Sequence, residues 1–149
     1  MYKHILIATD GSELAQKGLD HGLALAKALD AAVTIVTVTD NEYISPYAMA
    51  FDLQHGNNPL EAQRKALDAQ ARAVLDKASG KAEAAGVAAK TLHIAERHPA
   101  EGIVAAASDT GCDLIVMSSH GRRGVRRLML GSQTTEVVTT TDIPVLVIR

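Results

Sequence analysis

Short apolar runs alternate along this chain with longer segments in which apolar residues recur at helical spacing. The apolar runs, rich in β-branched residues, predict strands over 5–8, 33–39, 88–94, 113–117 and 144–148. The helical spacing predicts helices over 12–29, 58–86, 99–108 and 132–140. Strand and helix alternating in this way indicate a parallel sheet with right-handed crossovers and helices on both faces.

Capping residues support the two longest predicted helices. Asp10-Gly11-Ser12 forms a turn and N-cap before the first helix, and Asn58-Pro59 starts the second, which Gly86 ends. The apolar stripe expected on the second helix consists of Leu60, Leu67, Ala71, Val74, Ala78, Ala82 and Ala85.

Residues 40–58 show no clear period, although they hold three of the four aromatic residues, Tyr43, Tyr47 and Phe51. So long a connection is uncommon in a small domain. Three interpretations stay open: a lid, an interface element or a mobile loop.

Composition narrows the class of protein. The 149 residues fit one domain, residues 1–149, with 47% hydrophobic and 21% charged residues and a net charge of −2. Disorder, a nucleic-acid partner and a membrane surface are therefore not expected. The apolar run in MYKHILIATDG is too short for a signal peptide, and the single cysteine, Cys112, is expected to be a buried thiol. A cytoplasmic location fits both observations.

The segment 117–134, MSSHGRRGVRRLMLGSQT, has the composition of an anion-binding loop. Its glycines, Gly121, Gly124 and Gly131, allow a ligand to approach the backbone, and the helix expected from Ser132 would begin with unpaired N–H groups. The spacing matches neither a Walker A loop, which needs a Lys after Gly131, nor the dinucleotide motif GxGxxG. The alternative is a surface loop with turn glycines and a solvated basic face.

Asp10 would share a crevice with this loop if the strands 5–8 and 113–117 are neighbours, because ligands bind at the carboxyl ends of parallel strands where the winding reverses. A bridging Mg²⁺ would make a carboxylate compatible with phosphates. Taken without the loop, Asp10 is better explained as a turn residue that caps the first helix.

The opening ILIATDGS, the segment SSHGRRGVRRLMLGSQT and the closing IPVLVIR carry a resemblance to a known family. Over its whole length, the chain resembles the universal stress protein family of the UspA type. Nucleotide-binding members have Gly, two residues, Gly, nine residues, then Gly and Ser or Thr. Gly121, Gly131 and Ser132 match, whereas Ser118 stands where the first glycine is expected. The resemblance implies a doubly wound, Rossmann-like α/β sandwich with a five-stranded, mostly parallel sheet in the order 3-2-1-4-5.

The resemblance also implies a site for ATP or another adenine nucleotide, with Mg²⁺ reaching Asp10 through the nucleotide. Ala8 and Thr9 would lie beside the base or sugar, the Val38 backbone would recognise adenine, and Met117 would pack on the sugar or base. The ribose and phosphates would contact Ser118, Gly121, Gly131, Ser132, Gln133 and Thr134. Independently of the resemblance, at most two of the four arginines, Arg122 among them, would point inward and clamp phosphates, and the rest would face solvent or a dimer contact; the four are Arg122, Arg123, Arg126 and Arg127. A homodimer would form through residues 144–148, whose apolar edge independently invites strand pairing.

Catalytic features are lacking in the sequence. We find no activated nucleophile with a paired base and no phosphate-loop Lys, and the histidines show no metal-ligand spacing. We therefore expect a homodimeric nucleotide-binding protein with at most slow hydrolysis. The alternatives are a scaffold of the same fold whose pocket Ser118 has closed, and a hydrolase that uses Asp10, Mg²⁺ and His120, although a structural role for His120 is favoured.

Overall fold

The computed structural model, which describes residues 1–121 and 129–149, contains a five-stranded sheet in the order β3-β2-β1-β4-β5. All neighbouring strands are parallel. The strands are β1 (His4–Ala8), β2 (Ala32–Val38), β3 (Ala89–Ile94), β4 (Leu114–Ser118) and β5 (Val145–Ile148). The α/β class and the strand order are confirmed, and the predicted strands differ from the observed ones by one residue at their ends.

Hydrophobic residues on both faces explain why β1, β2 and β4 occupy the middle of the sheet. Ile7 pairs with Ile35 on one side and with Val116 on the other, and all three are fully buried. Because successive side chains alternate, Ile5 and Ile7 enter one core while Leu6 and Ala8 enter the other.

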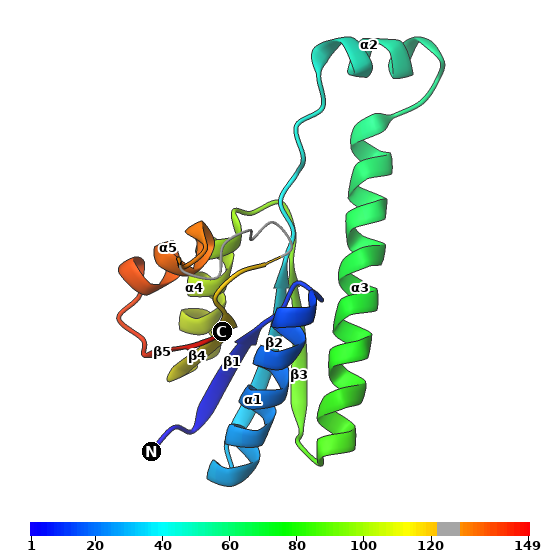
Figure 1. Cartoon of the computed structure of the whole chain (residues 1–149). Helices are drawn as coiled ribbons and strands as arrows, with labels where there is room; N and C mark the ends of the chain where they lie inside the picture. Colours follow the sequence, from blue (N-terminus) through cyan, green and yellow to red (C-terminus); the bar gives the residue numbers. More distant parts are fainter. Residues whose placement is uncertain (122–128) are drawn as a thin grey trace.

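Two pairs of helices cover the two faces of the sheet (Figure 1). Helices α1 (Glu13–Leu29) and α3 (Pro59–Ala85) cover one face, and α4 (Pro99–Thr110) and α5 (Ser132–Thr140) cover the other. Helix α1 lies close to β1 because Gly22 has no side chain: a Cβ there would lie 2.6 Å from Ile7 Cδ1.

Capping residues confirm the predicted starts of α1 and α3 and the predicted end of α3. Ser12 accepts a hydrogen bond from the Ala15 N–H, and Asn58 accepts one from the Glu61 N–H. Helix α3 ends at Gly86, whereas α4 continues two residues past the predicted end at 108 and stops at Gly111. The positive φ angles of these glycines, 71° and 69°, suit glycine.

The segment 40–58 contains a helix that the sequence pattern did not predict, α2 (Pro46–Gln54), with Ser45 as its N-cap. None of its residues is buried, so no apolar stripe marks it in the sequence. Figure 1 shows α2 at the tip of an arm, together with the start of α3, beyond the end of the sheet. The segment that the sequence left open as a lid, an interface element or a mobile loop is therefore part of a helical arm.

The apolar stripe predicted on α3 is wrong at the start of this helix, which belongs to the arm. The residues of α3 that are buried are Ala71, Leu75, Ala78 and Ala82, whereas Leu60 is 54% exposed. Leu60 lies on the part of the helix that extends beyond the sheet, where no core is available to bury it.

Among the described residues, none of the helices is long and apolar enough to cross a membrane.

Candidate functional site

A cavity of about 570 Å³ opens at the carboxyl ends of β1, β2 and β4. The chain leaves β1 toward α1 on one face of the sheet and leaves β4 toward α5 on the other. This reversal between neighbouring strands leaves a crevice between the two connections. The cavity therefore lies at the switch point of the fold.

The predicted binding residues that lie in the described part of the chain all line this one cavity. They are Ala8, Thr9, Asp10, Val38, Met117, Ser118, Gly121, Gly131, Ser132, Gln133 and Thr134. Arg122, with Arg123, Arg126 and Arg127, lies outside the described residues.

Asp10 is both a turn residue and a cavity residue. Its Oδ1 accepts a hydrogen bond of 2.9 Å from the Ser12 N–H, and the turn passes through Gly11 at φ 79°. Its Oδ2 faces the backbone of Gly121, where a Cβ would lie only 2.6 Å away. The strand-end turn thus holds one carboxylate oxygen and presents the other to the loop that follows β4.

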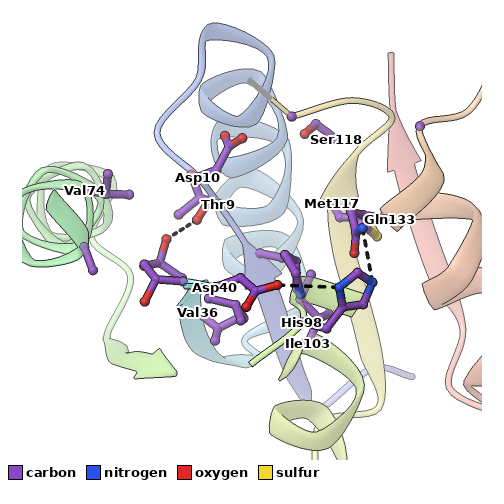
Figure 2. A pocket seen from close by; sticks show the side chains of 18 of the residues that line it. Thr9, Asp10, Val36, Asp40, Val74, His98, Ile103, Met117, Ser118 and Gln133 are labelled. Carbon is purple, nitrogen blue, oxygen red and sulfur yellow. Dashed lines mark hydrogen bonds and ion pairs between the residues drawn. The ribbon is translucent and has the colours of Figure 1, made fainter. Parts of the chain in front are cut away.

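The ends of β1 and β2 form a rigid floor for the cavity. The buried Thr37 hydroxyl donates to the Thr9 carbonyl oxygen (Figure 2), and the Thr9 N–H donates to the Val36 carbonyl oxygen at 3.0 Å. Val38 packs against Gly102 of α4, where a Cβ would lie 2.7 Å from Val38 Cγ1.

The start of α5 is tied to the loop after β4. The buried Thr134 hydroxyl lies 3.0 Å from the Ser118 carbonyl oxygen and 3.1 Å from that of Ser119, and donates to this pair. The Gly131 N–H donates to the Ser119 carbonyl oxygen at 2.8 Å. Gly131 is the N-cap residue of α5 and has no side chain to cap the helix, so the first turn of α5 borders the cavity without a side-chain cap.

Ser118 and His120 take part in the internal bonding of the same loop. The Ser118 hydroxyl donates to the His120 carbonyl oxygen at 2.8 Å, and Ser119 Oγ lies 3.0 Å from His120 Nδ1. His120 also lines the cavity. These bonds agree with the structural role favoured for His120 on the basis of the sequence.

His98 is a cavity residue that sequence reasoning missed. It follows the loop after β3 and immediately precedes α4, and its ring lies between Asp40 and the first turns of α5 (Figure 2). Its Nδ1 is 3.8 Å from Asp40 Oδ2, and its Nε2 is 3.1 Å from Glu136 Oε2. The only sequence signal was its place after a strand, because its partners come from two other segments.

Carboxylates set the protonation of His98. The hydrogen bond to Glu136 raises the pKa of the imidazole above its ordinary 6.5, and the negative charges of Glu136, Asp40 and Glu101 add to this, against a smaller opposing effect of desolvation. Elsewhere, burial raises the pKa of the Cys112 thiol, which is 5% exposed; the predicted buried thiol is confirmed.

The cavity lining divides into an apolar wall and a polar rim. The apolar wall comes from α3, α4 and β4 and includes Leu67, Ala71, Val74, Ile103 and Met117. The acidic groups are Asp10, Asp40 and Glu42. Among the described residues, no group of three or more His, Cys, Asp and Glu side chains could hold a metal ion by itself. The lining suits a ligand with one flat apolar part and one polar part.

This fold and site define a doubly wound α/β protein with a ligand cavity at its switch point. Within that class, the chain belongs to the universal stress protein family, whose profile matches residues 1–149. It is 30% identical to the universal stress protein YxiE of Bacillus subtilis, with both chains covered completely. It is 33% identical to the universal stress protein MJ0531 of Methanocaldococcus jannaschii, over all of this chain and 83% of that one.

A solved structure shows the same fold. The structure of MJ0577 from Methanocaldococcus jannaschii superposes with a TM-score of 0.81 at 29% identity, covering 99% of this chain and 96% of that one. The likeness covers 99% of this chain and therefore the strands and helices that border the cavity.

Proposed function

We propose that this protein binds an adenine nucleotide such as ATP in the cavity at the carboxyl edge of its sheet and acts in a stress response as a homodimer. The observation that carries the proposal is the juxtaposition of the Asp10–Gly121 contact, the start of α5 and the apolar wall of α3 around one cavity of about 570 Å³. The start of α5 offers N–H donors for phosphate, the apolar wall offers a surface for the base, and Asp10 and Gly121 line the same cavity.

Two solved universal stress proteins support an adenine ligand for this fold. One is a complex with cAMP, at 22% identity and a TM-score of 0.68. The other, from Archaeoglobus fulgidus, is a complex with dAMP, at 17% identity and a TM-score of 0.69. At these identities they share the fold with this chain, and the assignment of residues rests on the cavity described above.

In the proposed complex, the phosphates lie at the first turn of α5. The N–H groups of Ser132, Gln133 and Thr134 and the positive end of the helix dipole would stabilise them. The base would lie against the apolar wall near Val38 and Met117, with Ala8 and Thr9 beside the sugar. Arg122 would add a charge-assisted contact to the phosphates.

Asp10 fits a Mg²⁺ ion that arrives with the nucleotide. Asp10 lines the cavity, and Mg²⁺ is usually held by one or two carboxylates while phosphates and waters supply its other ligands. The ion would neutralise the repulsion between Asp10 and the phosphates. Any hydrolysis would be slow, because the described lining has no Lys to offset charge that develops during phosphoryl transfer.

The homodimer would form through β5, an edge strand of four apolar residues. None of them is fully buried in the single chain, and Leu146 is 37% exposed. Pairing with a second copy would satisfy the free edge and cover these side chains. Size-exclusion chromatography with light scattering would test this: Leu146→Lys should shift the protein toward the monomer, and a wild-type monomer would exclude the dimer.

Isothermal titration of nucleotide-stripped protein with Mg-ATP tests the ligand. We expect micromolar binding, which Val74→Trp should weaken at least about tenfold because it fills the cavity beside the apolar wall. Val138→Trp is the matched control, since Val138 is 44% exposed on α5 and lies outside the cavity lining. A folded wild-type protein that binds no nucleotide would instead support the scaffold alternative, in which Ser118 closes the pocket.

A further inference from the structure

The orientation of the Gln133 side-chain amide follows from its neighbours. The Ala100 N–H can only donate a hydrogen bond, and it lies 3.0 Å from one end of this amide. That end must be the oxygen Oε1, so the nitrogen Nε2 faces His98 Nε2 at 3.3 Å. Gln133, from α5, thereby caps α4, where the N-cap residue His98 makes no side-chain cap itself.

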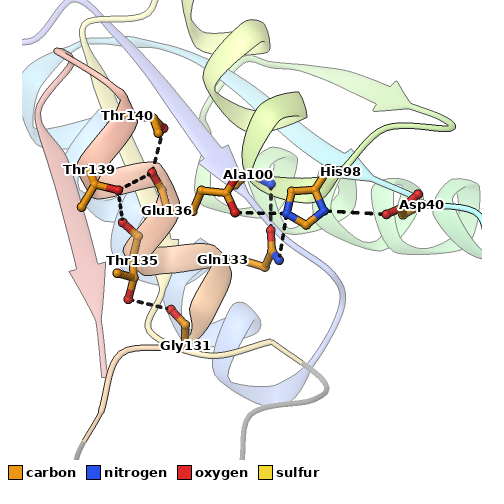
Figure 3. Close-up of polar contacts among 9 residues, drawn as sticks. All are labelled: Asp40, His98, Ala100, Gly131, Gln133, Thr135, Glu136, Thr139 and Thr140. Carbon is orange, nitrogen blue, oxygen red and sulfur yellow. Dashed lines mark hydrogen bonds and ion pairs between the residues drawn. The ribbon is translucent and has the colours of Figure 1, made fainter.

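His98 Nε2 consequently has two partners that require opposite protonation states (Figure 3). The Gln133 Nε2 amide is a donor, so it needs a lone pair on His98 Nε2. The Glu136 carboxylate is an acceptor at 3.1 Å, so it needs a proton there. One ring nitrogen carries either a proton or a lone pair, and therefore it satisfies only one partner at a time.

The groups that face His98 in the described structure favour its charged form. Glu136 on α5, Asp40 after β2 and Glu101 on α4 all bear carboxylates. The cavity itself would gain from the charge, because its described lining contains Asp10, Asp40 and Glu42 but neither Lys nor Arg. An anion entering this cavity would be stabilised by a positive charge at its rim.

We propose that His98 is a proton-linked positioning residue of the ligand site. The neutral imidazole accepts the hydrogen bond from Gln133. The protonated imidazole donates to Glu136 instead, which releases the Gln133 N–H for an anionic phosphate and places a positive charge beside it. Binding of a phosphate-bearing ligand is thus coupled to uptake of a proton at His98. This inference rests on the proposed function, since it concerns the same cavity.

The coupling fixes the direction of the pH dependence. A bound anion stabilises the imidazolium, so the pKa of His98 is higher in the complex than in the free protein. Between these two pKa values, affinity increases as the pH falls, by up to about tenfold per pH unit for one linked proton. Above the higher value, binding requires no proton from His98 and affinity levels off.

Calorimetry of Mg-ATP binding near neutral pH, in buffers with different ionisation enthalpies, measures this proton directly. We expect the observed binding enthalpy to increase with the ionisation enthalpy of the buffer. The slope of this dependence gives the number of protons taken up, which should be up to about one per nucleotide bound. His98→Asn should abolish the part of the uptake that arises at His98 and flatten the pH dependence of Kd. Equal uptake in the wild type and His98→Asn, or none in either, would overturn the inference while leaving nucleotide binding intact.

A second readout needs no nucleotide, and remains if His98→Asn fails to fold. Proton–carbon NMR of the imidazole should give a His98 pKa above the ordinary value, which Glu136→Gln lowers. The imidazole signals of the exposed His21, which bonds to the Lys17 carbonyl oxygen on α1, serve as the internal reference. Adding inorganic phosphate should raise the His98 pKa further. A His98 pKa that responds to neither Glu136→Gln nor phosphate contradicts the proposal, whereas absence of Mg-ATP binding alone contradicts only the proposed nucleotide.

Discussion

The carboxylate of Asp10 lies directly against the backbone of Gly121, although 111 positions separate them in the chain. A Cβ at Gly121 would come within 2.6 Å of Asp10 Oδ2, while Asp10 Oδ1 stays bonded to the Ser12 N–H. The contact joins the turn after β1 to the loop after β4, and both residues line the cavity.

Gly121→Ala should destabilise the fold, because the added methyl group displaces a carboxylate that already caps a turn. We expect a loss of about 1 kcal/mol in the free energy of unfolding, measured by urea denaturation. In the Asp10→Ala background, Gly121→Ala should lower the free energy of unfolding clearly less, because the carboxylate that the new methyl group would clash with is absent. In the isosteric Asp10→Asn background, the effect of Gly121→Ala should equal that in the wild type. If Gly121→Ala has the same effect in the wild type, Asp10→Ala and Asp10→Asn, the added methyl group clashes with another group.

Gly131→Ala should cost more than Gly121→Ala, because its Cβ would meet backbone. It would lie 2.9 Å from the Ser119 carbonyl oxygen and 3.5 Å from His120 Cα, although φ at Gly131 is an ordinary −61°. We expect a loss of about 2 kcal/mol, together with weaker nucleotide binding by calorimetry. Gly80→Ala is the matched control: nothing lies within 4 Å of its Cβ inside α3, so helix propensity should stabilise the protein by about 0.5–1 kcal/mol.

Two substitutions at Ser118 separate the effects of its methylene group and its hydroxyl. Ser118→Ala keeps the Cβ but removes the hydrogen bond to the His120 carbonyl oxygen, and we expect it to cost about 1 kcal/mol of stability. Ser118→Gly also removes the Cβ that lines the cavity, so it should bind Mg-ATP several-fold more tightly than Ser118→Ala. Equal affinities of the two variants would show that the side chain at 118 does not contact the ligand.

Asp113 should make the stability of the protein pH-dependent in the acid range. Partial burial raises the pKa of this carboxyl, but hydrogen bonds from the Lys3 and His4 N–H groups, at 2.8 and 3.0 Å, more than offset it and hold the pKa below its ordinary value of 3.8. A pKa that folding lowers gives stability that is present above the ordinary value and is lost as the pH falls through the folded value.

Asp113→Asn tests this directly. The amide can accept from only one of the two N–H groups, so we expect a loss of about 1–2 kcal/mol at pH 7 by urea denaturation. The difference from the wild type should shrink as the pH falls from 7 through the ordinary value of 3.8 to the lower pKa of the folded protein, because the aspartate is then protonated. A difference that stays constant between these pH values would assign the effect to packing alone.

The sequence by itself determined every described element except α2, with ends within two residues of the observed ones. β-Branched runs such as Val33–Thr39 have no polar face, so they can only be strands buried on both sides, and Ser12, Asn58, Gly86 and Gly111 cap helices through bonds to their near neighbours. Such local signals need no knowledge of the rest of the fold. Helix α2 was not predicted because it packs on no core and therefore carries no apolar stripe.

The contacts that make the site were decided only by tertiary structure. Asp10 meets Gly121, and His98 meets Asp40 and Glu136, because parallel strands deliver their carboxyl ends to one edge of the sheet. Each of these residues follows a strand or begins a helix, which the sequence shows, but their partners lie on segments distant in the chain. The register of the strands and the packing of α4 against α5 set which side chains meet, and neither leaves a periodic signal in the sequence.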